Sequence, residues 1–150
     1  MIEYRIATKE DIERMMDSRL EMLKVVNALP ADYVFSDTIV RESRDYFLNG
    51  DQTTVLAMDH EIIVGCASIS YIHIMPTFAH PTGKRAHLMN VYTKNAYRQQ
   101  GIARTMCEIL IKDAWDKGVT EINLDATAAG RPLYHSLGFQ DSGECMVLIR

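Results

Sequence analysis

The chain has 150 residues, 47% of them hydrophobic and 24% charged, a composition typical of one soluble globular domain with its own core. Its net charge of −4 argues against a general nucleic-acid binder, because such proteins present a basic surface. No apolar run approaches membrane-spanning length, and the N-terminus lacks the pattern of a signal peptide. The three widely spaced cysteines indicate reduced thiols in a cytoplasmic protein.

The N-terminal third predicts one strand followed by two helices. Residues 2–6 alternate between apolar and polar side chains, as a half-buried strand does. Thr8 is a typical N-cap for the next helix, whose core-facing side chains are Ile12, Met15, Met16, Leu20 and Leu23. Residues 27–35 interrupt this helix. Ser36 is expected to cap a second helix that runs to about Asn49.

The middle of the chain predicts strands separated by turn residues. Residues 53–58 and 62–74 form two strands joined by a tight turn, and residues 75–85 form a longer loop that contains two prolines and a glycine. Residues 86–93 and 121–126 are two further strands. Strands and helices are both expected along the chain, so the pattern predicts one mixed α/β domain.

The C-terminal part predicts a short helix and a hairpin. Pro132 is expected to open the helix and Gly138 to end it. Residues 139–150 are expected to turn at 141–143 and to end in an apolar strand at 146–149. The sequence contains no repeat, linker or low-complexity tract, so residues 1–150 are expected to form a single domain.

A loop between the strand at 86–93 and a following helix has the residue types of an anion-binding site. It reads Arg98-Gln99-Gln100-Gly101-Ile102-Ala103, and the helix after it carries apolar residues at Ile102, Met106, Ile109, Leu110 and Ala114. The free N–H groups and the positive dipole end of such a helix suit a phosphate. Gly101 and the small Ala103 leave room for a phosphate beside the backbone, and Arg98 adds positive charge. An ordinary helix start explains the loop alone equally well.

A second motif follows the strand at 121–126. The run Leu133-Tyr134-His135-Ser136-Leu137-Gly138-Phe139 lies 33 residues beyond the loop, counting from Gly101 to Tyr134. Together the two motifs resemble the pyrophosphate loop, Arg/Gln-x-x-Gly-x-Gly/Ala, and the Leu/Phe-Tyr-x-x-x-Gly-Phe signature of the GCN5-related N-acetyltransferase (GNAT) superfamily. Thr127 and Gly130 stand where that family often has Asn and Ala.

The resemblance implies a GNAT fold and transfer of an acetyl group. The expected fold is a mostly antiparallel central sheet of six to seven strands with about four helices. The expected activity is acetyl-CoA-dependent N-acetyltransfer to a primary amine of a small molecule or peptide, within a ternary complex. Two alternatives stay open: a non-catalytic acyl-CoA-binding or regulatory domain, and a transferase that uses a longer acyl-CoA. The resemblance also implies a possible homodimer.

The resemblance further assigns the parts of the cofactor site. Backbone groups of Val91, Tyr92 and Thr93 would hold the pantetheine arm in the manner of an added strand. The residues expected to hold the pyrophosphate are Arg98, Gln99, Gln100, Gly101, Ile102, Ala103 and Arg104. Thr127 is a weaker candidate for a bond to a pantetheine amide.

Tyr134 is the expected general acid. A phenol with a pKa of about 10 keeps its proton at neutral pH and can deliver it to a departing thiolate. The alternative for Tyr134 is core packing with a satisfied hydroxyl. Such packing is common for a tyrosine on a short amphipathic helix.

His87 is the first candidate for the general base, because histidine titrates near neutral pH. Its even spacing to Val91 and Thr93 predicts that all three face the same side of their strand. A histidine without a catalytic role is an equally good interpretation. His73, His80 and Asp125 are weaker candidates.

The residues favour neither metal nor covalent cysteine chemistry. The five histidines and three cysteines show no metal-ligand spacing. No cysteine lies in a motif that would lower its pKa. The resemblance to the GNAT family implies that residues 27–36, residues 75–85 and the C-terminal hairpin shape the acceptor pocket.

Overall fold

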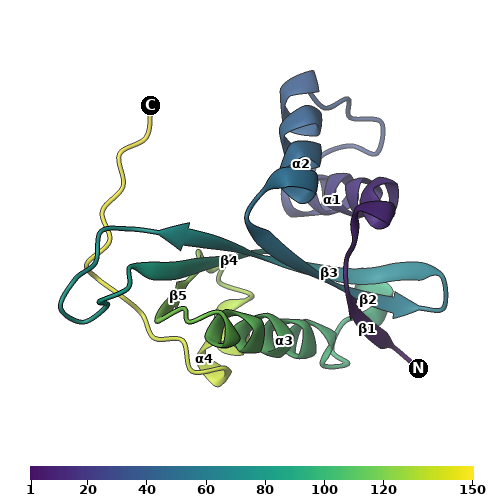
Figure 1. The fold of residues 1–150 in the computed structure, drawn as a ribbon. Helices are drawn as coiled ribbons and strands as arrows, with labels where there is room; N and C mark the ends of the chain where they lie inside the picture. The colour runs from purple at the N-terminus through teal and green to yellow at the C-terminus, as the bar shows by residue number, and fades with distance from the viewer.

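Five strands form one sheet whose spatial order follows the order of the sequence (Figure 1). This is a computed structural model that describes all residues, 1–150. The first three strand pairs are antiparallel and the last pair is parallel. The strands are β1 (Glu3–Ile6), β2 (Gln52–Asp59), β3 (Ile62–His73), β4 (Lys84–Thr93) and β5 (Glu121–Asn123).

Four helices cover the two faces of the sheet (Figure 1). They are α1 (Ile12–Val26), α2 (Asp37–Asn49), α3 (Ile102–Asp116) and α4 (Arg131–Ser136). On one face, Met15 and Met22 of α1 pack against Leu56 of β2 in a small cluster. On the other face, Met106 and Leu110 of α3 join the larger core. The expected mixed α/β architecture with four helices is confirmed. None of these helices is both long and apolar enough to cross a membrane.

Local signals in the sequence explain where the helices begin. The Ser36 hydroxyl accepts a hydrogen bond from the Ile39 N–H at 3.3 Å, as expected of an N-cap. Thr8 precedes a short 3₁₀ turn, Lys9–Asp11, that leads directly into α1. The Thr8 N–H donates to the Asp11 carboxylate at 2.8 Å and the Asp11 N–H donates to the Thr8 carbonyl at 3.0 Å, so both of these backbone donors are paired at the helix start.

The predicted C-terminal hairpin is wrong. Residues 140–150 contain no strand and leave the body of the fold as an extended tail beyond β4 and β5 (Figure 1). The tail leaves its apolar side chains exposed, from 81% at Val147 to 100% at Leu148. A strand exists only where a neighbour supplies ladder hydrogen bonds, and β5 at the sheet edge has only three residues. The sheet therefore has five strands instead of six or seven.

An acidic side chain ties the entry of α1 to β1. The Asp11 carboxylate is only 3% exposed and accepts hydrogen bonds from Arg5 at 2.6 and 2.8 Å and from Arg14 at 2.8 Å. The bonds from Arg5, followed by those from Thr8 and Arg14, hold the pKa of Asp11 far below its usual range.

We expect Asp11→Asn to lower the free energy of unfolding at pH 7 by about 2 kcal/mol, the scale of hydrogen bonds to a charged group. The pKa of Asp11 is lower in the folded chain, so its stabilisation is complete above the unfolded value of about 4 and is lost as pH falls below it. Urea unfolding at pH 7 and pH 3 should therefore show a difference between variant and wild type that narrows at pH 3. Glu13→Gln removes an exposed ion pair with Arg44 and should change stability little. A difference that does not depend on pH would contradict this account.

Candidate functional site

A bulge in β4 divides this strand into two parts with opposite side-chain alternation. Asn90 has a φ of 57°, in the left-handed region that asparagine tolerates better than most residues. On β3, Cys66 pairs with Tyr92 while Ser68 pairs with Met89, so one residue more lies on β4 than on β3 between these pairs. Side chains on the two sides of the bulge therefore cannot be compared by counting in twos.

The bulge overturns one prediction, that His87 and Val91 face the same side. His87 pairs with Ser70, whose hydroxyl hydrogen-bonds Tyr46 of α2 at 2.7 Å, so His87 lies on the α1–α2 face. Val91 packs against the core cluster of α3, on the opposite face. Even spacing predicts a common face only in a regular strand. The extra residue of the bulge reverses which side of the sheet the following side chains face.

The edge of β4 is open beside the bulge. β4 and β5 pair only from Arg85 with Glu121 to His87 with Asn123, whereas β4 continues to Thr93. The carbonyl of Thr93 accepts a hydrogen bond from the Arg98 Nε at 3.1 Å. The residues that were expected to hold a pantetheine arm, Val91, Tyr92 and Thr93, thus lie on an edge where no strand is placed next to them. An edge of this kind can accept an extended chain.

The loop before α3 presents a row of free backbone donors. Gln99 and Gly101 have φ values of 60° and 78°, and α3 begins at Ile102. The six N–H groups of residues 99–104 have no acceptor within the chain. Consecutive N–H groups at a helix start form a nest for an anion. A Cβ on Gly101 would meet no protein atom within 4 Å, so its positive φ is what favours glycine there.

Both arginines of this loop are also tied to the protein. Arg98 donates to Thr93, as described above, and Arg104 donates to the Ser136 hydroxyl of α4 at 2.7 Å. Arg104 also pairs with Glu108 one turn further along α3, at 3.0 Å. These contacts hold the loop between the open edge of β4 and α4, so its free N–H groups have a fixed position.

Tyr134 lies on the α3 side of the sheet, on α4. Its half-buried ring joins the same core cluster as Val91 and stands edge-on to Phe139, with 5.9 Å between ring centroids. Burial, with a smaller contribution from Cys107, raises the pKa of Tyr134 to about 12, and no side chain hydrogen-bonds its hydroxyl. The phenol therefore keeps its proton at neutral pH, with its hydroxyl free to donate.

Thr127 supports the turn that precedes α4. Its hydroxyl accepts a hydrogen bond from the Gly130 N–H at 3.1 Å. A Cβ on Gly130 would lie 3.1 Å from the Tyr134 ring and 3.3 Å from the Thr127 hydroxyl oxygen, so an alanine there would press on both side chains. Thr127 thus has a structural role in placing Tyr134, and its bond to a pantetheine amide stays a prediction.

His87 and Asp125 come together at the end of β5. The ring Nδ1 of His87 is hydrogen-bonded to the Asn123 side chain, and its Nε2 lies 3.9 Å from the Asp125 carboxylate. The other two candidates point elsewhere: His73 is bonded to the Thr82 carbonyl at 2.9 Å and His80 to the Thr120 hydroxyl at 2.8 Å. Of the four candidate bases, His87 and Asp125 are therefore the pair near the point where β4 and β5 separate.

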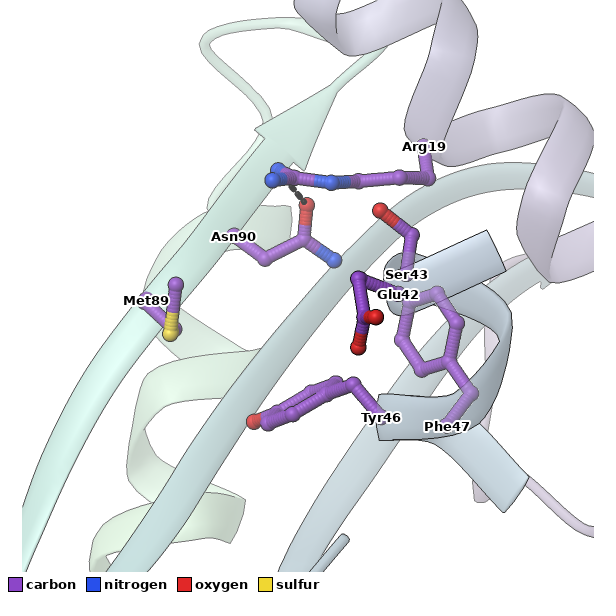
Figure 2. A pocket seen from close by; sticks show the side chains of 7 residues that line it. All are labelled: Arg19, Glu42, Ser43, Tyr46, Phe47, Met89 and Asn90. Atoms are coloured by element: carbon purple, nitrogen blue, oxygen red, sulfur yellow. Dashed lines mark hydrogen bonds between the residues drawn. The ribbon is translucent and has the colours of Figure 1, made fainter. Parts of the chain in front are cut away.

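A cavity of about 210 Å³ opens between α1, α2 and β4 (Figure 2). Its lining residues are Arg19, Glu42, Ser43, Tyr46, Phe47, Met89 and Asn90. The Arg19 guanidinium donates to the Asn90 side chain at 3.1 Å. This cavity was not predicted: the family resemblance implied an acceptor pocket formed by residues 27–36, residues 75–85 and the C-terminal hairpin. An arginine one turn after Met15, on the face that Met15 and Met22 bury, was the available signal.

The described residues contain no group of three or more His, Cys, Asp or Glu side chains that could hold a metal ion. Of the three thiols, Cys66 and Cys107 are buried, and burial raises the pKa of both. Raised pKa values keep these thiols protonated, which disfavours them as nucleophiles.

Comparison with known proteins decides the family. The profile of the acetyltransferase (GNAT) family matches residues 14–139, which is most of the chain. The chain belongs to the acetyltransferase (GNAT) family. The resemblance that the two sequence motifs indicated is thereby confirmed.

Known structures agree with this GNAT membership. A predicted acetyltransferase from Clostridium acetobutylicum, solved with acetyl-CoA, is 28% identical with a TM-score of 0.86, over 99% of this chain and 96% of that one. A GCN5-related N-acetyltransferase from Ralstonia eutropha JMP134 is 20% identical with a TM-score of 0.79, over 99% of both chains, and shares the fold.

A curated relative matches a shorter segment of this GNAT chain. Human N-acetyltransferase 8 is 31% identical over 64 residues, which is 41% of this chain and 28% of the human protein. The chain therefore spans well under half the length of that relative.

Substitutions of Asn90 can test the bulge in β4. Asn90→Ala and Asn90→Gly both remove the side chain that Arg19 and Cys66 contact, but only glycine adopts a φ of 57° without strain. We expect Asn90→Gly to be more stable than Asn90→Ala by about 1 kcal/mol in urea unfolding. In a regular strand alanine is favoured over glycine, so a more stable alanine variant would contradict the bulge.

Proposed function

We propose that this protein transfers the acetyl group of acetyl-CoA to a primary amine, directly within a ternary complex. One observation carries the proposal: six consecutive N–H groups of residues 99–104 lack a protein acceptor and are held beside the unpaired edge of β4. An anionic group followed by an extended amide-containing arm fits this combination, because the first needs N–H donors and the second needs a strand edge.

Acetyl-CoA has the groups that these two features can bind. The loop at residues 99–104 would hold its pyrophosphate, with Arg98 and Arg104 adding positive charge. Val91 and Thr93 would bond the pantetheine arm through their main chains. When bound, acetyl-CoA supplies the thioester whose carbonyl carbon receives the amine nitrogen.

The proposed transfer forms one N–C bond and breaks one C–S bond. The amine, with a pKa of about 10, must first lose a proton, and the sulfur gains one on leaving. Tyr134 keeps a proton on its hydroxyl at neutral pH and is proposed to donate it to the sulfur. His87, hydrogen-bonded to Asn123 and 3.9 Å from Asp125, is proposed to accept the amine proton, directly or through a water.

The acceptor is proposed to enter from the opposite face, through the cavity of Figure 2. Met89 and Asn90 line this cavity, and both lie at the bulge of β4, on the part of the strand that β5 leaves unpaired. The bulge would thus bring the two substrates to one strand from its two sides. Homodimerisation and a cytoplasmic location stay predictions.

The first test is calorimetric titration with acetyl-CoA, followed by detection of free thiol across a panel of primary amines. We expect Ala103→Glu to weaken acetyl-CoA binding at least tenfold, about 1.4 kcal/mol, because its carboxylate would stand in the first turn of α3 beside the proposed pyrophosphate. The same carboxylate favours the helix dipole, so stability should not fall. Ala103→Gln is the control of similar size without charge and should weaken binding less.

Three outcomes of this titration separate the alternatives. If Ala103→Glu binds acetyl-CoA as tightly as the wild type, the pyrophosphate does not bind at the loop of residues 99–104. Binding by the wild type without thiol release on any amine would favour a non-catalytic acyl-CoA-binding domain. Faster release from a longer acyl-CoA than from acetyl-CoA would favour the other enzyme alternative.

Tyr134→Phe tests the proposed general acid. We expect kcat to fall by about 100-fold, the lower range for loss of general acid catalysis. The KM for acetyl-CoA should change little, because phenylalanine preserves the packing. Steady-state kinetics of thiol release measures both. Tyr4→Phe, a change in the same core without a catalytic assignment, is the control, and Val91→Ala should also be mild. An unchanged kcat in Tyr134→Phe would remove Tyr134 from the mechanism.

A further inference from the structure

Arg19 is a half-buried arginine without an acidic partner. Elsewhere in the chain, Arg5, Arg14, Arg44 and Arg85 pair with carboxylates. Arg19 instead lies among the uncharged side chains of Tyr46, Cys66 and Asn90, and its one hydrogen bond is donated to Asn90. Burial lowers the pKa of Arg19. A guanidinium has five N–H donors, so most of its capacity is unused by the protein.

This guanidinium forms one wall of the cavity between α1, α2 and β4. Figure 2 shows it extending from α1 over Asn90, while the Glu42 carboxylate extends from α2 toward the middle of the same space. No ion pair joins Arg19 to Glu42, whose one ion pair is with the exposed Arg41, at 3.6 Å. The cavity therefore presents a guanidinium without an acidic partner and a carboxylate whose partner lies outside the cavity lining.

The remaining lining of the cavity is mainly apolar and held in place. Phe47 and Met89 contribute apolar surface. Tyr46 is fixed by its hydrogen bond to Ser70, whose hydroxyl also contacts the Met89 sulfur at 3.9 Å. At about 210 Å³ the cavity is smaller than the roughly 300–1,000 Å³ of pockets for drug-sized ligands. It suits a small acceptor with an apolar or aliphatic part.

A half-buried cation without a counter-ion is unfavourable unless a ligand provides one. Guanidinium groups bind carboxylates with two parallel hydrogen bonds, which lysine cannot do. Glu42 would repel a phosphate dianion more strongly than a monoanionic carboxylate, and it would attract an ammonium group. The combination therefore selects a molecule with one carboxylate and one amine.

We propose that the acceptor amine is a small amino acid or amino-acid-like compound whose carboxylate pairs with Arg19. Glu42 then attracts the ammonium form of the acceptor into the cavity. This inference rests on the proposed acetyl transfer and names its substrate class. Arg19 is a specificity-determining residue for the acceptor, in addition to holding the Asn90 side chain at the bulge.

Matched acceptors test the proposal. Each amino acid is compared with the amine that lacks its carboxylate: leucine with 3-methylbutylamine, phenylalanine with 2-phenylethylamine, and lysine with cadaverine. We expect the wild type to prefer the carboxylate member by at least tenfold in kcat/KM. The intrinsic reactivity of each amine cancels when this preference is compared between wild type and Arg19→Gln. We expect Arg19→Gln to lose the preference, mainly through a higher KM for the amino acid.

Two controls separate recognition from structure. Lys9→Gln removes one positive charge at an exposed position just before α1, outside the cavity lining, and it should keep the preference. Calorimetry should show unchanged acetyl-CoA binding by Arg19→Gln. If Arg19→Gln lowers kcat/KM equally for both members of each pair, Arg19 only positions Asn90 and the proposal fails.

The remaining outcomes also decide. If the wild type prefers the amines without a carboxylate, the proposal is overturned. This result does not depend on whether the Arg19→Gln variant folds. If acetyl-CoA binds but no amine releases thiol, the proposed transfer fails, and the carboxylate site is judged by calorimetry with phenylalanine alone. Binding that Arg19→Gln weakens at least tenfold then supports the site, and absence of binding by the wild type overturns it.

Discussion

The bulge at Asn90 is the constraint on which the arrangement of both proposed substrates depends. With one extra residue in β4, Met89 lines the cavity beneath α1 and α2, while Val91, two positions later, packs on the α3 face. A regular strand would put both side chains on one side. Contacts from Arg19 and Cys66 hold the Asn90 side chain, so the left-handed backbone at this position is supported from two elements.

Hydrogen-bonding capacity is distributed unevenly over the molecule. Asp11 is bonded by two arginines and by the main chain of Thr8, and the strand ladders satisfy most of the sheet. The groups with unused capacity gather around β4: the N–H row before α3, the Tyr134 hydroxyl and the Arg19 guanidinium. All three lie near the proposed binding sites of acetyl-CoA and its acceptor, where a ligand could complete their hydrogen bonds.

The predictions that succeeded depended on contacts between residues close in the chain. Ser36 caps α2 because its hydroxyl reaches an N–H three residues on, and Gly101 precedes α3 because a positive φ favours glycine. The two motifs could be recognised in the sequence because the residues of each lie close together in the chain, within one strand–loop–helix or turn–helix unit. The prediction of a C-terminal hairpin was wrong because the apolar residues 146–149 suit a strand, but a strand also needs a neighbour that supplies its ladder hydrogen bonds.

By itself, the sequence indicated the family and the order of the elements as far as α4, and it singled out the loop at residues 98–104 and Tyr134 as candidate site residues. The tertiary structure alone decided which face His87 occupies, that β4 and β5 separate after Asn123, and that Arg19 lies in a cavity with Glu42. These features depend on register and on contacts between segments up to 71 residues apart, as between Arg19 and Asn90. Local propensity carries no record of such contacts, because they arise only when separate elements pack together.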